Sequence, residues 1–232
     1  ENLEAYNYYL QGNTFYWRSY QERDWTMAIN MYRKAIELDS SFIQAYTKLA
    51  GSHMSLYWWY FDRTEERLDK ARKAIDAAFK INPDFSDAHI ALGVYYYKGF
   101  LEYDKALSHL EKAHDLNPNN AECIHYIAAV NRRMGNWQKA EKEFLRAYKS
   151  DPKNSRVVYN TAETYFLLGK YSEALDYINM AIRLNPEWAK AYEQKIKIYL
   201  KKEGDTRNSR EVLKEASLYI NPLSDPVLAF RT

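Results

Sequence analysis

The chain has 232 residues, of which 47% are hydrophobic and 28% are charged, and its 33 basic and 31 acidic side chains give a net charge of +2. This small charge favours neither a nucleic-acid partner nor direct membrane contact. A single cysteine, Cys123, excludes an internal disulfide framework, and the sequence has neither an apolar run of about 18 residues nor an amino-terminal signal pattern. We expect a cytoplasmic location, or a periplasmic one if a membrane segment precedes the chain.

Taken from the amino terminus, the chain divides into about six successive helix pairs. We expect these repeats at residues 4–40, 42–83, 86–118, 120–152, 154–186 and 188–222, and residues 225–232 look like the start of a further helix. A small residue in the first helix and an alanine in the second stand 12 residues apart in the fourth and fifth repeats. This spacing is 16 residues in the first repeat, 21 in the second and 13 in the third, where one residue is added near Gly99. The sixth repeat turns at Gly204 but lacks the alanine register.

A constant period defines these repeats. Pro83, Pro118, Pro152 and Pro186 are separated by 35, 34 and 34 residues. Alanines recur at fixed distances before three of these prolines: Ala106, Ala113, Ala140, Ala147, Ala174 and Ala181. A fixed period of this size predicts one supersecondary element that is copied and stacked, so that neighbouring copies share a core.

Glycine and proline mark the ends of the helices. Gly135 and Gly169 each follow the expected end of a first helix, where a left-handed residue is least costly as glycine. Proline ends the second helices, because its ring disfavours helical geometry at the preceding residue, such as Asn117. No strand-like alternation of apolar and polar residues occurs, so the sequence predicts an all-helical fold.

This set of small residues, glycine turn, aromatic residue and closing proline resembles the tetratricopeptide repeat over nearly the whole chain. The resemblance implies an all-α fold, a right-handed α-solenoid superhelix of antiparallel helix pairs in one array. The opening from Glu4 to Ile29 further resembles repeat arrays attached to bacterial signalling proteins with a nucleotide cyclase, a kinase or a winged-helix regulator. That second resemblance implies a regulatory or sensory module. Because the chain begins with Glu1 and not with methionine, we expect it to be a fragment of a longer protein.

Residues for catalysis, for a metal or for a cofactor are not expected. The histidines lack the spacing of a zinc-binding helix, and a glycine-rich phosphate loop is absent. Cys123 has no positioned base near it in the sequence and is expected to be a small buried apolar residue. The sequence therefore predicts a protein that is not an enzyme and that needs no cofactor.

The resemblance implies that the first helices line a concave groove. In that family the second, fifth, ninth, twelfth and thirteenth positions of each repeat face the ligand. With the sixth position of the fifth repeat added, the expected partner-binding residues are Tyr97, Lys98, His125, Arg132, Arg133, Arg156, Tyr159, Asn160 and Glu163. At the five positions, the first two repeats carry no charge, whereas the third to sixth carry seven basic and four acidic residues. The groove is therefore expected to be neutral and aromatic at one end and basic at the other.

We predict that this groove binds an extended or helical protein segment whose acidic end is held by Arg132, Arg133 and Arg156. The alternative is that these arginines are solvated or pair with Glu122 and Glu163. The lysine and asparagine pattern with which some arrays of this family capture the carboxyl termini of chaperones is absent.

Two interpretations apply to the aromatic residues of the long first and second repeats. These residues are Tyr16, Trp17, Tyr20, Tyr57, Trp58 and Trp59, and we expect the two groups to lie beside each other. They either pack together as a buttress for the added turns or form a docking patch for a partner or a second copy of the chain.

Two classes of function remain. The first is a protein-interaction scaffold that binds a protein or peptide partner in its groove, or associates with itself. The alternative is a small-molecule sensor, in which the aromatic half of the groove closes around a ligand. An open groove favours the first class, and a deep closed pocket favours the second.

Overall fold

The computed structural model describes residues 2–18, 20–204 and 206–220, and within these ranges it contains helices and no strand. In chain order the helices are α1 (Leu3–Arg18), α2 (Glu22–Leu38), α3 (Ile43–Trp58), α4 (Glu65–Ile81), α5 (Ser86–Tyr95), the π-helical turn η1 (Tyr96–Phe100), α6 (Tyr103–Leu116), α7 (Ala121–Arg133), α8 (Trp137–Ser150), α9 (Ser155–Leu167), α10 (Tyr171–Leu184), α11 (Ala189–Glu203) and α12 (Arg207–Ser217). The all-helical prediction is confirmed for these ranges. The helix expected at 225–232 lies outside them, as does the end of the sixth repeat at 221–222.

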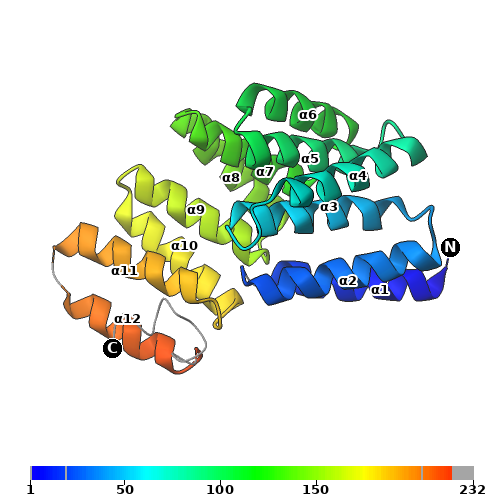
Figure 1. Ribbon diagram of the computed structural model, residues 1–232. Coiled ribbons are helices and arrows are strands. Elements are labelled where there is room, and N and C mark those ends of the chain that lie inside the picture. The colour runs from blue at the N-terminus through cyan, green and yellow to red at the C-terminus, as the bar shows by residue number, and fades with distance from the viewer. Residues whose placement is uncertain (1, 19, 205, 221–232) are drawn as a thin grey trace. The chain divides into compact units, whose positions relative to one another are not determined.

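The helices fall into two compact units, an amino-terminal unit (Glu1–Tyr126) and a carboxy-terminal unit (Ile127–Thr232), and α7 runs from the first into the second. The two helices of a pair lie side by side and antiparallel, as α1 and α2 do (Figure 1). Within the amino-terminal unit α3 packs on both α2 and α5, and within the carboxy-terminal unit α11 packs on α10 and α12. The fold is an α-solenoid of antiparallel helix pairs, as predicted. The grouping of all pairs into one array stays a prediction.

The second helices end where the prolines indicate. The residues that follow α4, α6, α8 and α10 are extended, with φ between −143° and −148°: Asn82, Asn117, Asp151 and Asn185. A following proline ring favours this geometry. Asp39 has nearly the same φ, −146°, after α2, although Ser40 follows it. The first repeat therefore reverses the chain without proline.

Small residues lie where paired helices approach each other most closely. The repeating alanines of the second helices have no exposed surface: Ala28, Ala35, Ala71, Ala106, Ala113, Ala140, Ala147, Ala174 and Ala181. Gly93 of α5 makes the tightest of these approaches in its pair, because a Cβ atom there would lie 2.8 Å from Leu110 Cγ and 3.0 Å from the carbonyl oxygen of Ala106. Backbone on one side and a buried side chain on the other leave no room for a methyl group.

Replacing Gly93 with alanine is therefore expected to lower the free energy of unfolding by about 1–3 kcal/mol through overpacking, measured by urea denaturation. The double variant Gly93→Ala/Leu110→Ala tests the cause, since removing the Leu110 side chain relieves the nearer of the two clashes. The two changes should then cost less together than the sum of their separate costs. Additive costs would contradict this explanation.

Turn glycines have the backbone geometry that the sequence predicts. Gly135, Gly169 and Gly204 follow α7, α9 and α11 with φ of 82°, 75° and 74°. In this left-handed region a Cβ atom is strained, so glycine is the residue that ends these helices at least cost.

The irregular spacings of the first three repeats appear as longer helices and a π-helical turn. The helices α1 and α3 have 16 residues and α2 and α4 have 17, against 13 and 14 in the regular pairs α7–α8 and α9–α10. Each long helix thus gains nearly one turn. In the third repeat the single added residue is taken up by η1, since a π-helical turn holds one residue more than an α-helical turn.

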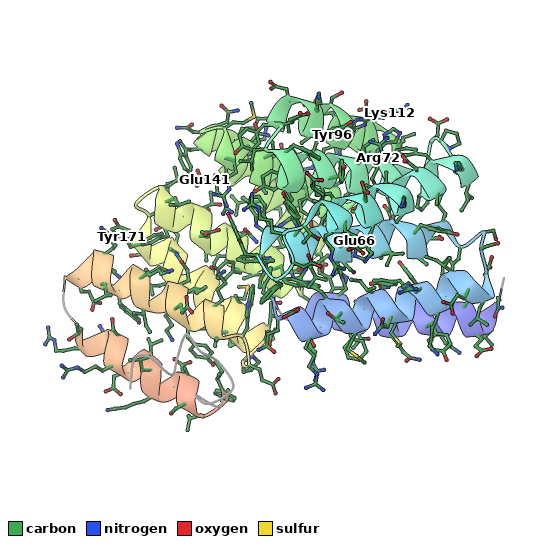
Figure 2. The ribbon with its side chains drawn as sticks, in the orientation of Figure 1. Glu66, Arg72, Tyr96, Lys112, Glu141 and Tyr171 are labelled. Carbon is green, nitrogen blue, oxygen red and sulfur yellow. The ribbon has the colours of Figure 1, made fainter. Side chains whose placement is uncertain are left out.

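The π-helical turn is packed against side chains of α4, α5 and α6. The ring of Tyr96 stacks on His109 of α6 with centroids 5.6 Å apart, and His109 stacks on His89 of α5 at 5.8 Å. Figure 2 shows Arg72 of α4 near Tyr96, and the Arg72 guanidinium lies 6.0 Å from the ring centroid of Tyr95. The added residue is therefore part of the packed structure of the amino-terminal unit.

Candidate binding surface on the first helices

A cavity of about 20 Å³ lies among the first helices of the amino-terminal unit. It is lined by Tyr16 of α1, by Thr47, Lys48 and Gly51 of α3, by Asp87, Ile90, Ala91 and Val94 of α5, and by Glu122 and Tyr126 of α7. Most of these residues occupy the second, fifth, ninth or twelfth position of their repeat, which the resemblance to the tetratricopeptide repeat placed on the concave face. The regular spacing of the helices therefore brings equivalent positions together around one small cavity.

Three residues of this wall, Lys48, Ala91 and Tyr126, stand at positions that the sequence analysis did not consider, and Lys48 is the charged one. Its ammonium group pairs with the carboxylate of Glu122 and lies 5.7 Å and 5.4 Å from the ring centroids of Tyr16 and Trp17. Burial by itself would lower the pKa of Lys48, but the charge of Glu122, the smaller effects of Tyr16 and Asp87 and the hydrogen bond to Glu122 together more than offset this, so the pKa lies above its ordinary value. The side chains of the pair are only 14% and 17% exposed.

A signal for Lys48 was present in the sequence. Lys48 stands at the sixth position of its repeat, as Asn160 does in the fifth repeat, and that position was considered only for Asn160. The first two repeats lack charge only at the five positions that were counted. The sixth position adds a buried cation, which is neutralised by a carboxylate from the fourth repeat.

Asp87 brings a second carboxylate to the cavity. Its Oδ1 accepts a hydrogen bond of 3.1 Å from Asn120 Nδ2. Burial raises the pKa of Asp87, and the nearby Glu122 adds to this effect, while Lys48 and the Asn120 hydrogen bond oppose it. The pKa stays above its ordinary value because burial, together with Glu122, outweighs the opposing effects of Lys48 and Asn120.

The predicted residues Lys98 and His125 lie close to this cavity, at Tyr126. The Lys98 ammonium is 5.4 Å from the Tyr126 ring centroid, and the His125 ring meets the Tyr126 ring edge-on at 5.3 Å. Tyr97, by contrast, is 5% exposed and packs against Trp58, with ring centroids 5.2 Å apart. Tyr97 is therefore a core residue of the amino-terminal unit.

In the carboxy-terminal unit, Arg132 is engaged within the protein. Its guanidinium is 2.8 Å from Glu163, donates to the side chains of Asn160 at 3.0 Å and Thr164 at 3.3 Å, and lies 5.2 Å from the Phe144 ring centroid. These contacts join α7 to α9 and leave Arg132 only 8% exposed. They fit the alternative in which arginine pairs with Glu163. The other pairing considered, with Glu122, is taken by Lys48.

The remaining predicted residues of that unit differ in exposure. Arg156 is 8% exposed and Tyr159 is 6% exposed, and the Tyr159 ring packs on Trp188 with centroids 4.7 Å apart. Arg133 is exposed. Of the three arginines expected to hold an acidic segment, Arg133 alone therefore presents its side chain to solvent.

The aromatic residues of the long repeats meet, and most of them are packed. Trp17, Tyr20 and Trp59 lie against a buried cluster that includes Tyr16 and Trp25. The Tyr20 and Trp59 rings join the two groups with centroids 4.9 Å apart.

The rest of this aromatic set packs elsewhere or lies near the surface. Trp58 faces Tyr97 of the third repeat, and Arg63 lies 5.2 Å from the ring centroid of Tyr57. The neighbouring Tyr60 and Phe61 are 73% and 42% exposed. These contacts favour the buttress interpretation for the predicted residues, and the docking interpretation stays a prediction.

The described ranges contain no group of three or more histidine, cysteine or acidic residues that fits a metal ion, and none of their helices is long and apolar enough to span a membrane. Cys123 is fully buried, and its Sγ donates to the carbonyl oxygen of Leu110 at 3.2 Å. Its predicted burial is confirmed.

Stacked helix pairs whose first helices share one surface define a helical-repeat protein, and comparison with known proteins agrees. Residues 63–121 match the family described as tetratricopeptide repeat, and residues 101–181 match the family described as anaphase-promoting complex, cyclosome, subunit 3. The helices α4, α5 and α6, which lie within residues 63–121, thus match the tetratricopeptide repeat.

Individual proteins show the same similarity. Anaphase-promoting complex subunit 3 of Schizosaccharomyces pombe is 27% identical over 171 residues, which cover 74% of this chain and 24% of that protein. The Hsp70-Hsp90 organizing protein of Triticum aestivum is 27% identical over 191 residues, or 79% of this chain and 30% of that protein. The chain thus spans about a quarter to a third of the length of these relatives. A solved tetratricopeptide repeat protein of Thermus thermophilus has the same fold, with a TM-score of 0.64 at 18% identity over 85% of this chain and 98% of that protein.

Proposed function

We propose that the protein is a protein-interaction module that binds a segment of a partner protein along the first helices of its amino-terminal unit. The observation that carries this proposal is the cavity, where side chains from α1, α3, α5 and α7 meet at recurring positions. A surface built from equivalent positions of successive helices suits an extended or helical segment, because such a segment also presents side chains at regular intervals.

The relatives support the same class of function. One is named as a subunit of the anaphase-promoting complex and another as an organizing protein for Hsp70 and Hsp90. The finer proposal, a regulatory or sensory module of a larger bacterial signalling protein, rests on the resemblance of residues 4–29 to the openings of such arrays. Self-association through the same surface is a further form of the interaction that we propose.

A variant on an exposed first-helix residue tests this proposal. Leu10 of α1 occupies the sixth position of its repeat, as Lys48 does, and is 43% exposed. Peptides selected from a phage-displayed library of random dodecamers on the intact chain should lose binding to the Leu10→Glu variant, because a charge is placed where the segment lies. Affinity is measured by fluorescence anisotropy with the synthesised peptides.

The matched control is Leu38→Glu at the end of α2, where the leucine is 38% exposed but belongs to a second helix. It should leave the affinity unchanged. If the selected peptides bind Leu10→Glu as they bind the original chain, or if both variants weaken binding equally, the first-helix surface is not the binding site.

The same experiment bears on the acidic segment predicted for the carboxy-terminal unit. With Arg132 held by Glu163, that prediction now depends mainly on Arg133. We retain it as a proposal in which acidic residues of the bound segment contact Arg133. Charge reversal at this exposed position should weaken the binding of selected acidic peptides.

The cavity does not favour the alternative of a small-molecule sensor. Pockets for drug-sized ligands enclose about 300–1,000 Å³. The cavity between the first helices holds about 20 Å³, which is room for a single group the size of a water molecule.

A further inference from the structure

The cavity in the amino-terminal unit has more negative than positive side chains in its wall. Two carboxylates, Asp87 and Glu122, lie in its wall with one ammonium group, that of Lys48. Lys48 pairs with Glu122, while Asp87 receives only the hydrogen bond from Asn120. The amide of Asn120 is a dipole and carries no charge, so one carboxylate at the cavity lacks a full counter-charge.

Neighbouring cations do not remove this imbalance. Lys98 lies over the ring of Tyr126 and is absent from the cavity wall. The charges that act on Asp87 are those of Lys48 and Glu122, and burial together with Glu122 keeps the pKa of Asp87 raised. A further positive charge at the cavity would be stabilised by Asp87, whereas a further negative charge would meet two carboxylates.

The size and the walls of the cavity narrow the choice of cation. Its volume of about 20 Å³ holds one group the size of water, which suits an ammonium group better than the larger planar guanidinium. The rings of Tyr16 and Tyr126 form part of the wall, and aromatic rings attract ammonium groups. Lys48 and Lys98 already place ammonium groups within 5.7 Å of these two ring centroids.

We propose that this cavity receives the primary ammonium group of a lysine side chain of the bound segment, which pairs with Asp87 beside the rings of Tyr16 and Tyr126. This inference rests on the proposed function, since the lysine belongs to the partner segment. A lysine side chain suits the site because its alkyl chain is apolar, as are Ile90 and Val94 in the wall of the cavity. The amino-terminal unit would thus select segments with a lysine.

The experiment uses small probes that each carry one chemical feature. N-acetyl-lysine methylamide is titrated into the ¹⁵N-labelled intact chain, and it should shift the amide resonances of residues 87–94 and Tyr126 in a saturable way. The ε-acetylated derivative, which lacks the charge, and N-acetyl-arginine methylamide, which carries the larger guanidinium, should leave these resonances in place. Leucine methylamide, whose only charge is an α-ammonium group, separates a lysine side chain from an amino terminus and should also have no effect.

A variant locates the site. Asp87→Asn should weaken binding of the lysine probe by at least about tenfold, because a charge-assisted hydrogen bond becomes a neutral one. Asp84→Asn is the matched control, since Asp84 is three residues away and its side chain is 75% exposed. The inference is overturned if the ε-acetylated probe binds as well as the charged probe, if leucine methylamide binds in place of the lysine probe, or if Asp87→Asn retains full affinity. The comparison of the probes uses the original chain, so its result does not depend on whether Asp87→Asn folds stably.

The outcomes also separate this inference from the proposed function. Selected peptides that bind the Leu10 surface without any preference for lysine would overturn the cation site and leave the interaction module standing. A saturable response to the lysine probe, with no peptide that depends on Leu10, would overturn the proposed binding surface and support the cation site alone.

Discussion

Replacing Glu122 with alanine is expected to lower the free energy of unfolding by about 3 kcal/mol, because the ammonium group of Lys48 loses its partner inside the protein. The two side chains are 14% and 17% exposed, so water can solvate the remaining charge only in part. We place the value at the low end of the range for buried pairs because Asp87 still attracts Lys48. Urea denaturation followed by circular dichroism measures the change.

The double variant Lys48→Met/Glu122→Leu distinguishes the removal of one charge from the removal of the pair. Two apolar side chains of similar volume remove both charges of the pair, so this variant should be clearly more stable than Glu122→Ala, although Asp87 then loses the favourable charge of Lys48. If Glu122→Ala has no effect on stability, the pair is solvated and not buried. If the double variant is as unstable as the single variant, shape and not charge explains the loss.

Lowering the pH from 7 to 5 is expected to reduce the free energy of unfolding by about 2 kcal/mol through His53 alone. His53 is 5% exposed, and Arg67 Nη1 lies 2.8 Å from its Nδ1, where a neutral ring accepts the hydrogen bond. Burial and the charge of Arg67, with smaller effects of Lys70 and Arg33, lower the pKa of His53 to about 3, against a weak opposing effect of Asp62.

The direction of this pH dependence follows from where the proton binds. Between pH 6.5 and 3 the unfolded chain protonates this histidine and the folded protein does not, so stability is greatest above pH 6.5 and falls as the pH decreases. His89 and His109 also have lowered pKa values, first because of burial, and they contribute in the same direction.

A variant isolates the contribution of His53. His53→Asn keeps an acceptor near the position of Nδ1 but does not titrate in this range, whereas His89 and His109 titrate in both proteins. The loss of stability between pH 7 and pH 5, measured by urea denaturation, should therefore be about 2 kcal/mol smaller in the variant. Equal losses in the two proteins would show that His53 is protonated in the folded state.

The fold was predictable because its determinants are local. The proline after Asn117 and the glycine at 135 act on the backbone of their own residue or its neighbour, and the structure has the predicted extended and left-handed geometries at these points. The alanines repeat because a close approach between paired helices recurs once in each repeat. The added residue near Gly99 was visible as an altered spacing, although its form, a π-helical turn, was not.

The binding surface was predictable only in part. The five repeat positions that were expected to face the ligand include most of the cavity wall, among them Asp87 and Glu122. Such positions of stacked helices lie side by side. They did not include Lys48, whose position had been considered in one other repeat only. The same positions also predicted that the charge of Arg132 is available to a bound segment, whereas Glu163 and Asn160 of the next repeat contact it. Which acidic residue each cation contacts depends on side chains from different helices, and the sequence left those pairings open.

The sequence by itself determined the class of fold and the helix ends that proline and glycine mark. Backbone geometry and helical periodicity are set by nearby residues, so the pattern of a single sequence is enough to predict them. The tertiary structure decided which charges remain available on the first helices. It pairs Lys48 with Glu122 across 74 residues, and it gives Asp87 the uncharged amide of Asn120 as its hydrogen-bond partner. The strength of each buried pairing depends on distances between helices, and a local sequence pattern does not contain these distances.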